Sequence, residues 1–153
     1  MTSWVTMTPA GRDCVMLRAL GYQWIGVEWI GVDGWREAGY SWPQPGRGDG
    51  GLRHFYPLRA VPSFSTRPGD AWSVVQVMEA RGYRLSGLEH GHDGQWRCWF
   101  EHPIRMHDAG DGLNRYPVAL GSAGATMPEA VCRSALWALG VDTMTDTDRG
   151  EGE

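Results

Sequence analysis

Three segments of the chain place apolar residues at helical spacing between start residues and a glycine stop. The first begins at Thr8, which suits the N-cap position, and Pro9 fits the first helical position because its φ is fixed. One face of this helix carries Ala10, Cys14, Leu17 and Leu20. The glycines expected to end the three helices are Gly21, Gly82 and Gly140.

The second and third predicted helices have sharper boundaries. Ser65 or Thr66 is expected to cap the second helix, with Pro68 in its first turn. Its apolar face consists of Ala71, Trp72, Val75 and Met78. The third helix starts with Thr126 and Glu129 at capping-box spacing. Its apolar face consists of Met127, Val131, Ala135, Ala138 and Leu139.

Residues with β propensity predict three strands, at 83–88, 95–101 and 115–120. The turn 90–94 joins the first two into a hairpin. The segment 22–34 also alternates, and short strands or an extended crossing segment fit it equally well. Two further segments lack a regular period and are expected to be loops: 34–62, rich in Gly, Pro and aromatic residues, and 102–114, which is polar.

These elements predict an α+β fold of the α/β/α-sandwich type. About three helices would pack on a small antiparallel sheet, with one long Gly/Pro/aromatic loop. A length of 153 residues suits one domain, here assigned to 1–140. The remaining residues, 141–153, are acidic and lack periodicity, so we expect a disordered tail.

Charge and composition make two kinds of partner, bulk nucleic acid and membranes, less expected. The net charge is −4, and the acidic tail accounts for it, so the body is close to neutral. A neutral body is unfavourable for bulk nucleic-acid binding, which needs many phosphate contacts. No stretch resembles a membrane span or a signal peptide, so we expect a cytoplasmic protein that does not bind membranes.

Every basic residue other than histidine is arginine. Arginine is planar and permanently charged, and it suits bidentate recognition of phosphate or carboxylate. The three cysteines lack metal-ligand spacing and fall on apolar faces, so we expect them in the core: Cys14, Cys98 and Cys132.

No catalytic constellation is present in the sequence. The segment 121–124 lacks the full nucleophile-elbow pattern, and 46–51 lacks the residues that complete a phosphate-binding P-loop. His90, His92 and Asp93 could hold a metal at the hairpin tip, and a second cluster could include His102, His107 and Asp108. We favour solvated turn residues, and we therefore expect no catalytic residue, no metal and no cofactor.

Aromatic and basic residues gather beside and within the segment 34–62. The candidate ligand-binding residues are Trp24, Trp29, Trp35, Arg36, Tyr40, Trp42, Arg47, Arg53 and His54. Aromatic rings that stack on bases, together with arginines that hold phosphate, would make a nucleotide pocket. The same residue types suit a protein interface, or rings that anchor a loop over the sheet. By contrast, Trp72 and Trp96 are expected in the core.

One family resemblance covers about residues 9–140. The strings FSTRPGDAWSVVQVMEARGY, QWRCWFE and ATMPEAVCRSALWALG, with an opening AGRDCVMLRALGYQW, resemble the phage ABA sandwich domain family. The chain departs from the family pattern in the insertion 67–69 ahead of Asp70 and in longer loops. The resemblance implies a phage or prophage accessory protein in the bacterial cytoplasm, and it brings no catalytic residues.

Together these observations predict a non-enzymatic, homo-oligomeric binding protein that a phage uses against host defence. Its ligand would be a nucleotide-derived immune signal that it sequesters. Two alternatives remain open. The protein could inhibit a host factor by binding it, or it could be a small metal-assisted enzyme that degrades such a signal.

Overall fold

The computed structural model describes the chain in several stretches. The stretches are 3–26, 28–29, 35–36, 38–41, 53, 55–108, 115–141 and 149–152. The predicted α+β class, with three helices packed on a small antiparallel sheet, is confirmed.

The three α-helices begin and end largely where the sequence predicts. Their bounds are α1 Pro9–Ala19, α2 Pro68–Ala80 and α3 Met127–Ala138. Thr8 and Thr126 cap α1 and α3 through their side chains. The predicted stop glycines Gly21, Gly82 and Gly140 all adopt positive φ, which favours glycine.

The predicted cap of α2 is wrong. Its N-cap is Arg67, and no side chain caps the helix there. The Ser65 hydroxyl instead donates to Asp13 Oδ1 at 2.8 Å, and the Ser65 backbone N–H donates to the same oxygen at 2.9 Å. Ser65 therefore links the turn that precedes α2 to α1 through two buried hydrogen bonds, and it does not cap α2.

A four-stranded antiparallel sheet in the order β6-β7-β8-β9 forms one layer. Its strands are β6 Arg84–His90, β7 Trp96–Asp108, β8 Arg115–Gly124 and β9 Arg149–Gly152. The strands extend well beyond their predicted lengths, because β7 continues to Asp108 where a loop was expected. β9 also corrects the sequence prediction, since Arg149–Gly152 pairs with β8 inside the segment assigned to a disordered tail.

The first part of the chain forms smaller sheets. A three-stranded sheet in the order β1-β4-β5 consists of β1 Gln23–Ile25, β4 Gly39–Ser41 and β5 Phe55–Pro57. A two-stranded pair consists of β2 Glu28–Trp29 and β3 Trp35–Arg36. Short 3-10 turns, η1 Trp4–Thr6 and η2 Leu58–Ala60, flank these elements. Most described residues of 34–62 are thus in strands or a turn rather than in one long loop.

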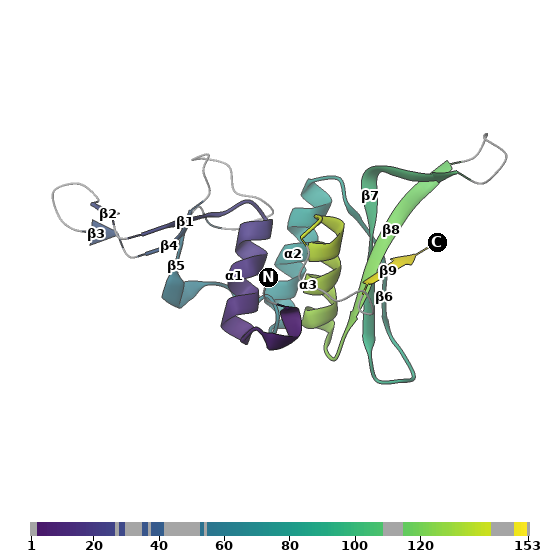
Figure 1. Cartoon of the computed structure of the whole chain (residues 1–153), viewed down its shortest axis with the longest axis horizontal. Coiled ribbons are helices and arrows are strands. Elements are labelled where there is room, and N and C mark those ends of the chain that lie inside the picture. Colours follow the sequence, from purple (N-terminus) through teal and green to yellow (C-terminus); the bar gives the residue numbers. More distant parts are fainter. Residues whose placement is uncertain are drawn as a thin grey trace.

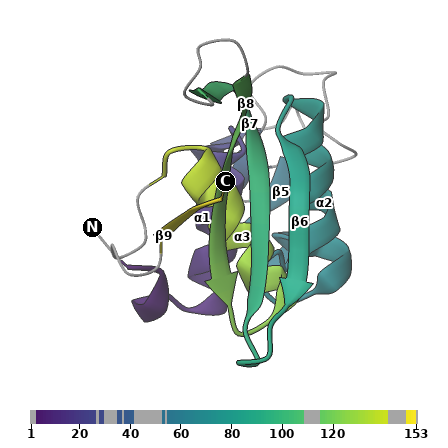
Figure 2. The same cartoon turned by 90° about the vertical axis from the view of Figure 1, so that its right-hand side faces the viewer.

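The helices lie between the three-stranded and the four-stranded sheet (Figure 1). All three helices lie on one side of the four-stranded sheet, and the opposite face of that sheet has no described helix in front of it (Figure 2). The layers therefore run sheet, helices, sheet rather than helix, sheet, helix. This order follows from the small sheet at the far side of α1. Its strand β1 lies in the segment 22–34, for which short strands were one of two expectations.

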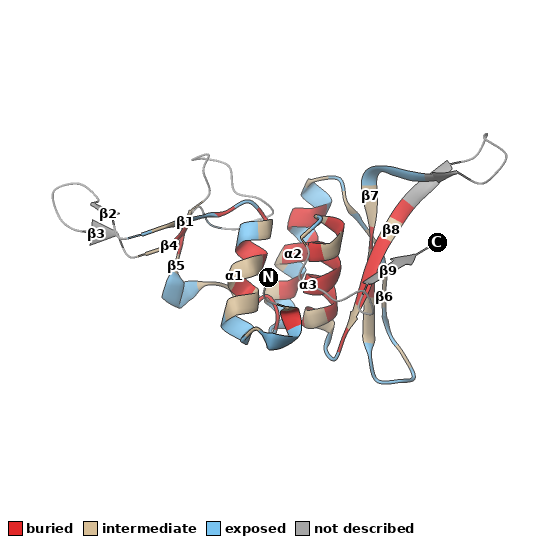
Figure 3. Ribbon diagram, in the orientation of Figure 1, coloured by how far each residue is buried: buried red, intermediate tan, exposed pale blue. Residues whose placement is uncertain are grey.

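The core extends from the four-stranded sheet through α3 and α2 to α1 (Figure 3). α3 is buried on almost all sides, not on a single stripe, because the sheet covers one of its faces and the other helices cover the rest. The Ser134 hydroxyl at its centre donates to the Cys98 carbonyl at 2.7 Å and accepts from the Ser122 N–H at 3.0 Å. This pairing satisfies polar groups that burial would otherwise penalise.

Several face assignments need correction. Trp72, expected in the core, is 45% exposed, and the buried face of α2 is completed by Val74 and Val77. Ala10 is exposed, and Met16 takes its place in the core. Cys98 and Cys132 are buried as predicted, while Cys14 and Trp96 are partly buried against the core.

No α-helix in the described stretches is long and apolar enough to cross a membrane.

Candidate ligand-binding hollow

A surface hollow of about 380 Å³ lies where β5 and η2 meet the start of α2. This volume falls within the usual range of small-molecule sites, roughly 300–1,000 Å³. Two arginines, a tyrosine and a carboxylate provide its chemistry. The described residues that line it are Arg53, Tyr56, Ala60, Val61, Pro62, Ser63, Arg67 and Asp70.

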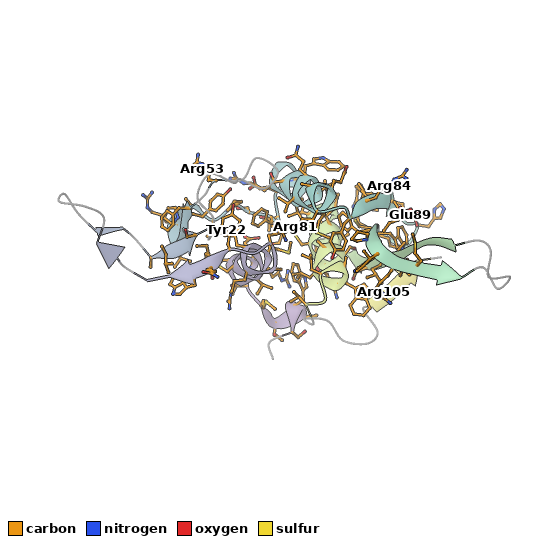
Figure 4. All side chains as sticks on the ribbon, turned by 90° about the horizontal axis from the view of Figure 1, so that it is seen from above. Tyr22, Arg53, Arg81, Arg84, Glu89 and Arg105 are labelled. Carbon is orange, nitrogen blue, oxygen red and sulfur yellow. The ribbon has the colours of Figure 1, made fainter. Side chains whose placement is uncertain are left out.

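Two tyrosine hydroxyls fix the backbone of Arg53. The Tyr22 hydroxyl donates to the Arg53 carbonyl, and the Arg53 N–H donates to the Tyr56 hydroxyl at 2.9 Å. Tyr22 directly precedes β1, and Tyr56 lies in β5, with ring centroids 5.6 Å apart. We call this pair the tyrosine clamp. It holds Arg53 beside Tyr22 at the small-sheet end of the molecule (Figure 4), where the exposed Arg53 lines the hollow.

The second arginine is positioned by the turn before α2. The Ser63 carbonyl accepts the Arg67 N–H at 2.9 Å, and the Ser63 N–H donates to Asp70 Oδ2 at 2.9 Å. The bond between Ser65 and Asp13 anchors the same turn to α1. Both arms of the hollow thus depend on α1, one through Tyr22 just after its end and the other through Asp13.

Burial raises the pKa of the Tyr56 phenol, and the bond from the Arg53 N–H partly opposes that rise. The phenol is therefore protonated at neutral pH. Because its oxygen accepts from Arg53, its own hydrogen can be donated to a bound ligand. Within the described stretches, neither Arg53 nor Arg67 forms an ion pair, so both guanidiniums can bind an anion.

Among the described residues that were predicted from the sequence to bind a ligand, Arg53 alone lines this hollow. Trp24 and Tyr40 contact each other across β1 and β4, with ring centroids 5.2 Å apart and planes at 66°. Tyr40 is 4% exposed and packs as a core residue, whereas Trp24 is 49% exposed. This edge-to-face pair anchors the small sheet and is separate from the hollow.

The remaining predicted residues are only partly described. Trp29 and Trp35 are cross-strand partners in the pair β2-β3, and Arg36 is the partner of Glu28. The side chains of these residues lie outside the described part of the structure. Trp42, Arg47 and His54 lie outside the described residues.

The sequence did not predict the lining residues Tyr56, Arg67 and Asp70, nor Tyr22, which holds the Arg53 carbonyl. Tyr22 and Tyr56 contribute hydroxyls that meet only after the small sheet forms, so local patterns did not indicate them. Arg67 and Asp70 had a visible signal, because the segment 67–69, which the sequence analysis singled out as an insertion ahead of Asp70, includes the first and adjoins the second.

The proposed metal alternative at the hairpin tip finds no support in the geometry. Asp93 forms an ion pair with Arg97 at 2.6 Å, and this contact lowers the pKa of the Asp93 carboxyl. The His90 ring stacks on Trp96, with centroids 4.6 Å apart. The described residues contain no group of three metal-ligating side chains. The predicted second cluster extends to His107 and Asp108, whose side chains are not described.

Searches of protein-family models, curated proteins and solved structures found no match to this chain. The resemblance to the phage ABA sandwich domain family therefore stays a prediction based on the sequence motifs alone.

Proposed function

We propose that the protein binds a small phosphate-bearing ligand in this hollow and does not turn it over. The observation that carries the proposal is that Arg53 and Arg67, from separate segments of the chain, line one hollow. The Tyr56 phenol lines the same hollow and is held in place by the Arg53 N–H. Arginine forks match phosphate oxygens in pairs, and a pre-positioned donor lowers the entropy lost on binding.

The mixed charge of the hollow favours a nucleotide-like ligand over free phosphate. Two arginines and Asp70 leave one net positive charge in the lining. Asp70 uses Oδ2 to hold Ser63, so its other oxygen can accept a hydrogen bond from a sugar hydroxyl. A ligand with both phosphate and hydroxyl groups would satisfy the arginines and the carboxylate together.

On the sequence resemblance, we further propose that this ligand is a nucleotide-derived immune signal of a bacterial host. The protein would then be a phage counter-defence factor that sequesters the signal in the cytoplasm. Sequestration needs tight binding and release of the ligand intact. Two arginines and a tyrosine can bind the ligand, and Asp70, the carboxylate in the lining, already accepts a hydrogen bond from Ser63.

The test is thermal melting of the full chain against cyclic nucleotides, ADP-ribose derivatives and pyrophosphate. A ligand that binds only the native state raises the melting temperature by mass action. The ligand is then released by heat and analysed by chromatography. Intact ligand supports sequestration, altered ligand indicates an enzyme, and no shift with any compound contradicts the binding proposal.

Matched variants locate the site. Arg53→Ala and Arg67→Ala should each weaken binding by about tenfold or more, since each removes a charge-assisted contact. Arg53→Lys keeps the charge but loses the fork, so it should fall between the wild type and Arg53→Ala. Arg84→Ala, on the distant four-stranded sheet, is the control and should bind like the wild type.

The second candidate function is inhibition of a host protein. Its specific support is exposed apolar area near the small sheet, with Trp24 49% and Leu58 54% exposed. Exposed tryptophan is typical of binding hot spots. If this function holds, Trp24→Ala should abolish a stable complex in pull-downs from host lysate, while Arg53→Ala should leave that complex intact.

A further inference from the structure

The face of the four-stranded sheet that points away from the helices carries an ordered pattern of side chains. Cys98 and Phe100 face the core, so the alternating residues of β7 face outward. Strand register sets three outward rows across β6, β7 and β8. The rows are Arg84–Glu101–Ala119, Gly87–Trp99–Gly121 and Glu89–Arg97–Ala123.

The middle row is organised by Trp99. A methyl group built on Gly87 would lie 2.8 Å from Trp99 Cε3, and one on Gly121 would also clash with the indole. The ring therefore lies across both neighbouring strands, and only glycine fits beneath it. Gly150 of β9 continues the row as the register partner of Gly121. Because the residues around the Trp99 ring are glycines, no neighbouring side chain in this row would keep another protein surface away from the ring.

The two outer rows each pair one positive with one negative residue, and the order of the charges along β6 is the reverse of that along β7. Along β6 the charges run Arg84 then Glu89, and along β7 the facing positions run Glu101 then Arg97. Within the described stretches, no ion pair involves Arg84, Glu89 or Glu101, whereas Arg97 pairs with Asp93. Two positive and two negative side chains give no net charge, which is unfavourable for nucleic acid.

We propose that this face binds a second copy of the chain, with the twofold axis along the row of Trp99. Rotation about that axis reverses the order of the rows, so Arg84 faces Glu89 of the other copy and Glu101 faces its Arg97. Trp99 then meets its own symmetry mate on the axis. A twofold interface must be self-complementary, and this charge pattern satisfies that requirement.

The outer part of β7 carries two exposed apolar side chains. Ile104 is 82% exposed and Met106 is 51% exposed. In Figure 1 this part of β7 bends away from the helices, toward the uncovered side of the sheet. Burial of exposed apolar side chains against a second copy would supply the driving force that the charge pairs alone lack.

Sedimentation of the full chain over a wide concentration range tests the proposal, with Arg84→Glu and Glu89→Arg as variants. Each reversal places like charges opposite one another twice in the dimer, so each should raise the dimer dissociation constant about tenfold or more. Both side chains are exposed, so the fold should tolerate the changes. Glu79→Arg, on the exposed face of α2, is the matched control and should dimerise like the wild type.

Mixing the two variants identifies the axis. Arg84→Glu carries two negative charges where Glu89→Arg carries two positive charges, so a heterodimer about the Trp99 row regains attraction at every pair. We expect the mixture to dimerise almost as well as the wild type. A wild-type monomer at all concentrations, or variants that dimerise normally, would overturn the proposal. Weakened variants without rescue in the mixture would overturn the proposed axis.

Discussion

The small sheet β1-β4-β5 and the body formed by the helices and the four-stranded sheet are stabilised in different ways. The body buries large apolar side chains such as Phe100, Leu136 and Met78. The small sheet has strands of three residues each, and hydroxyl contacts to the Arg53 backbone help to fix it. The body thus supplies stability, and the small sheet supplies a positioned arginine whose loss would affect binding more than folding.

The largest expected effect is in the body. Phe100 is fully buried on β7, so Phe100→Ala should lower the free energy of unfolding by about 3–5 kcal/mol. Urea unfolding measured by circular dichroism would report this loss. A change below about 1 kcal/mol would mean that the body does not carry the stability of the chain.

A smaller but more selective effect is expected in the small sheet. A methyl group on Gly39 would lie 2.8 Å from Pro57 Cα and would also clash with the Tyr56 carbonyl. Gly39→Ala should therefore separate β4 from β5, cost about 1–3 kcal/mol, and abolish ligand binding by displacing Tyr56.

Ligand titration beside urea unfolding separates the two effects of Gly39→Ala. Gly26→Ala is the control, because its added methyl group meets nothing within 4 Å. If Gly39→Ala binds ligand normally, the small sheet does not position the hollow.

The contact between α1 and the turn before α2 should respond to pH. Burial raises the pKa of Asp13 above its usual 3.8, so the folded state holds this proton more tightly than the unfolded state. The contribution of Asp13 to stability is thus highest below pH 3.8 and falls as pH rises through the folded pKa.

Asp13→Asn removes this titration and keeps an oxygen that can accept both bonds from Ser65. The variant should be more stable than the wild type at pH 7, and the difference should vanish at acidic pH. Urea unfolding at several pH values measures it. A difference that does not change with pH would show that folding leaves the pKa of Asp13 unshifted.

The smallest effect is expected at Trp72 on α2. Because this side chain is 45% exposed, Trp72→Ala should change the free energy of unfolding by about 0.5 kcal/mol or less. Thermal unfolding would measure the change. A loss comparable to that of Phe100→Ala would mean that the ring is covered, for example by a partner.

Local chemistry explains what could be predicted from the sequence. Thr8, Thr126 and the three stop glycines act on neighbouring residues, so the helix bounds were readable. Strand lengths depend on partners far along the chain, which is why β7 was predicted too short and β9 was missed. The hollow was largely hidden for the same reason, since Tyr22 meets Arg53 across 31 positions of sequence.

The contact between Trp4 and α3 has a consequence for synthesis of the chain. Trp4 is fully buried, and its indole N–H donates to Glu129 Oε1 at 3.1 Å, a partner 125 residues later. At about 5–20 residues per second, a ribosome needs roughly 6–25 s to make that partner. Trp4 therefore lacks this hydrogen-bond partner, and is open to chaperones, until the ribosome has made Glu129.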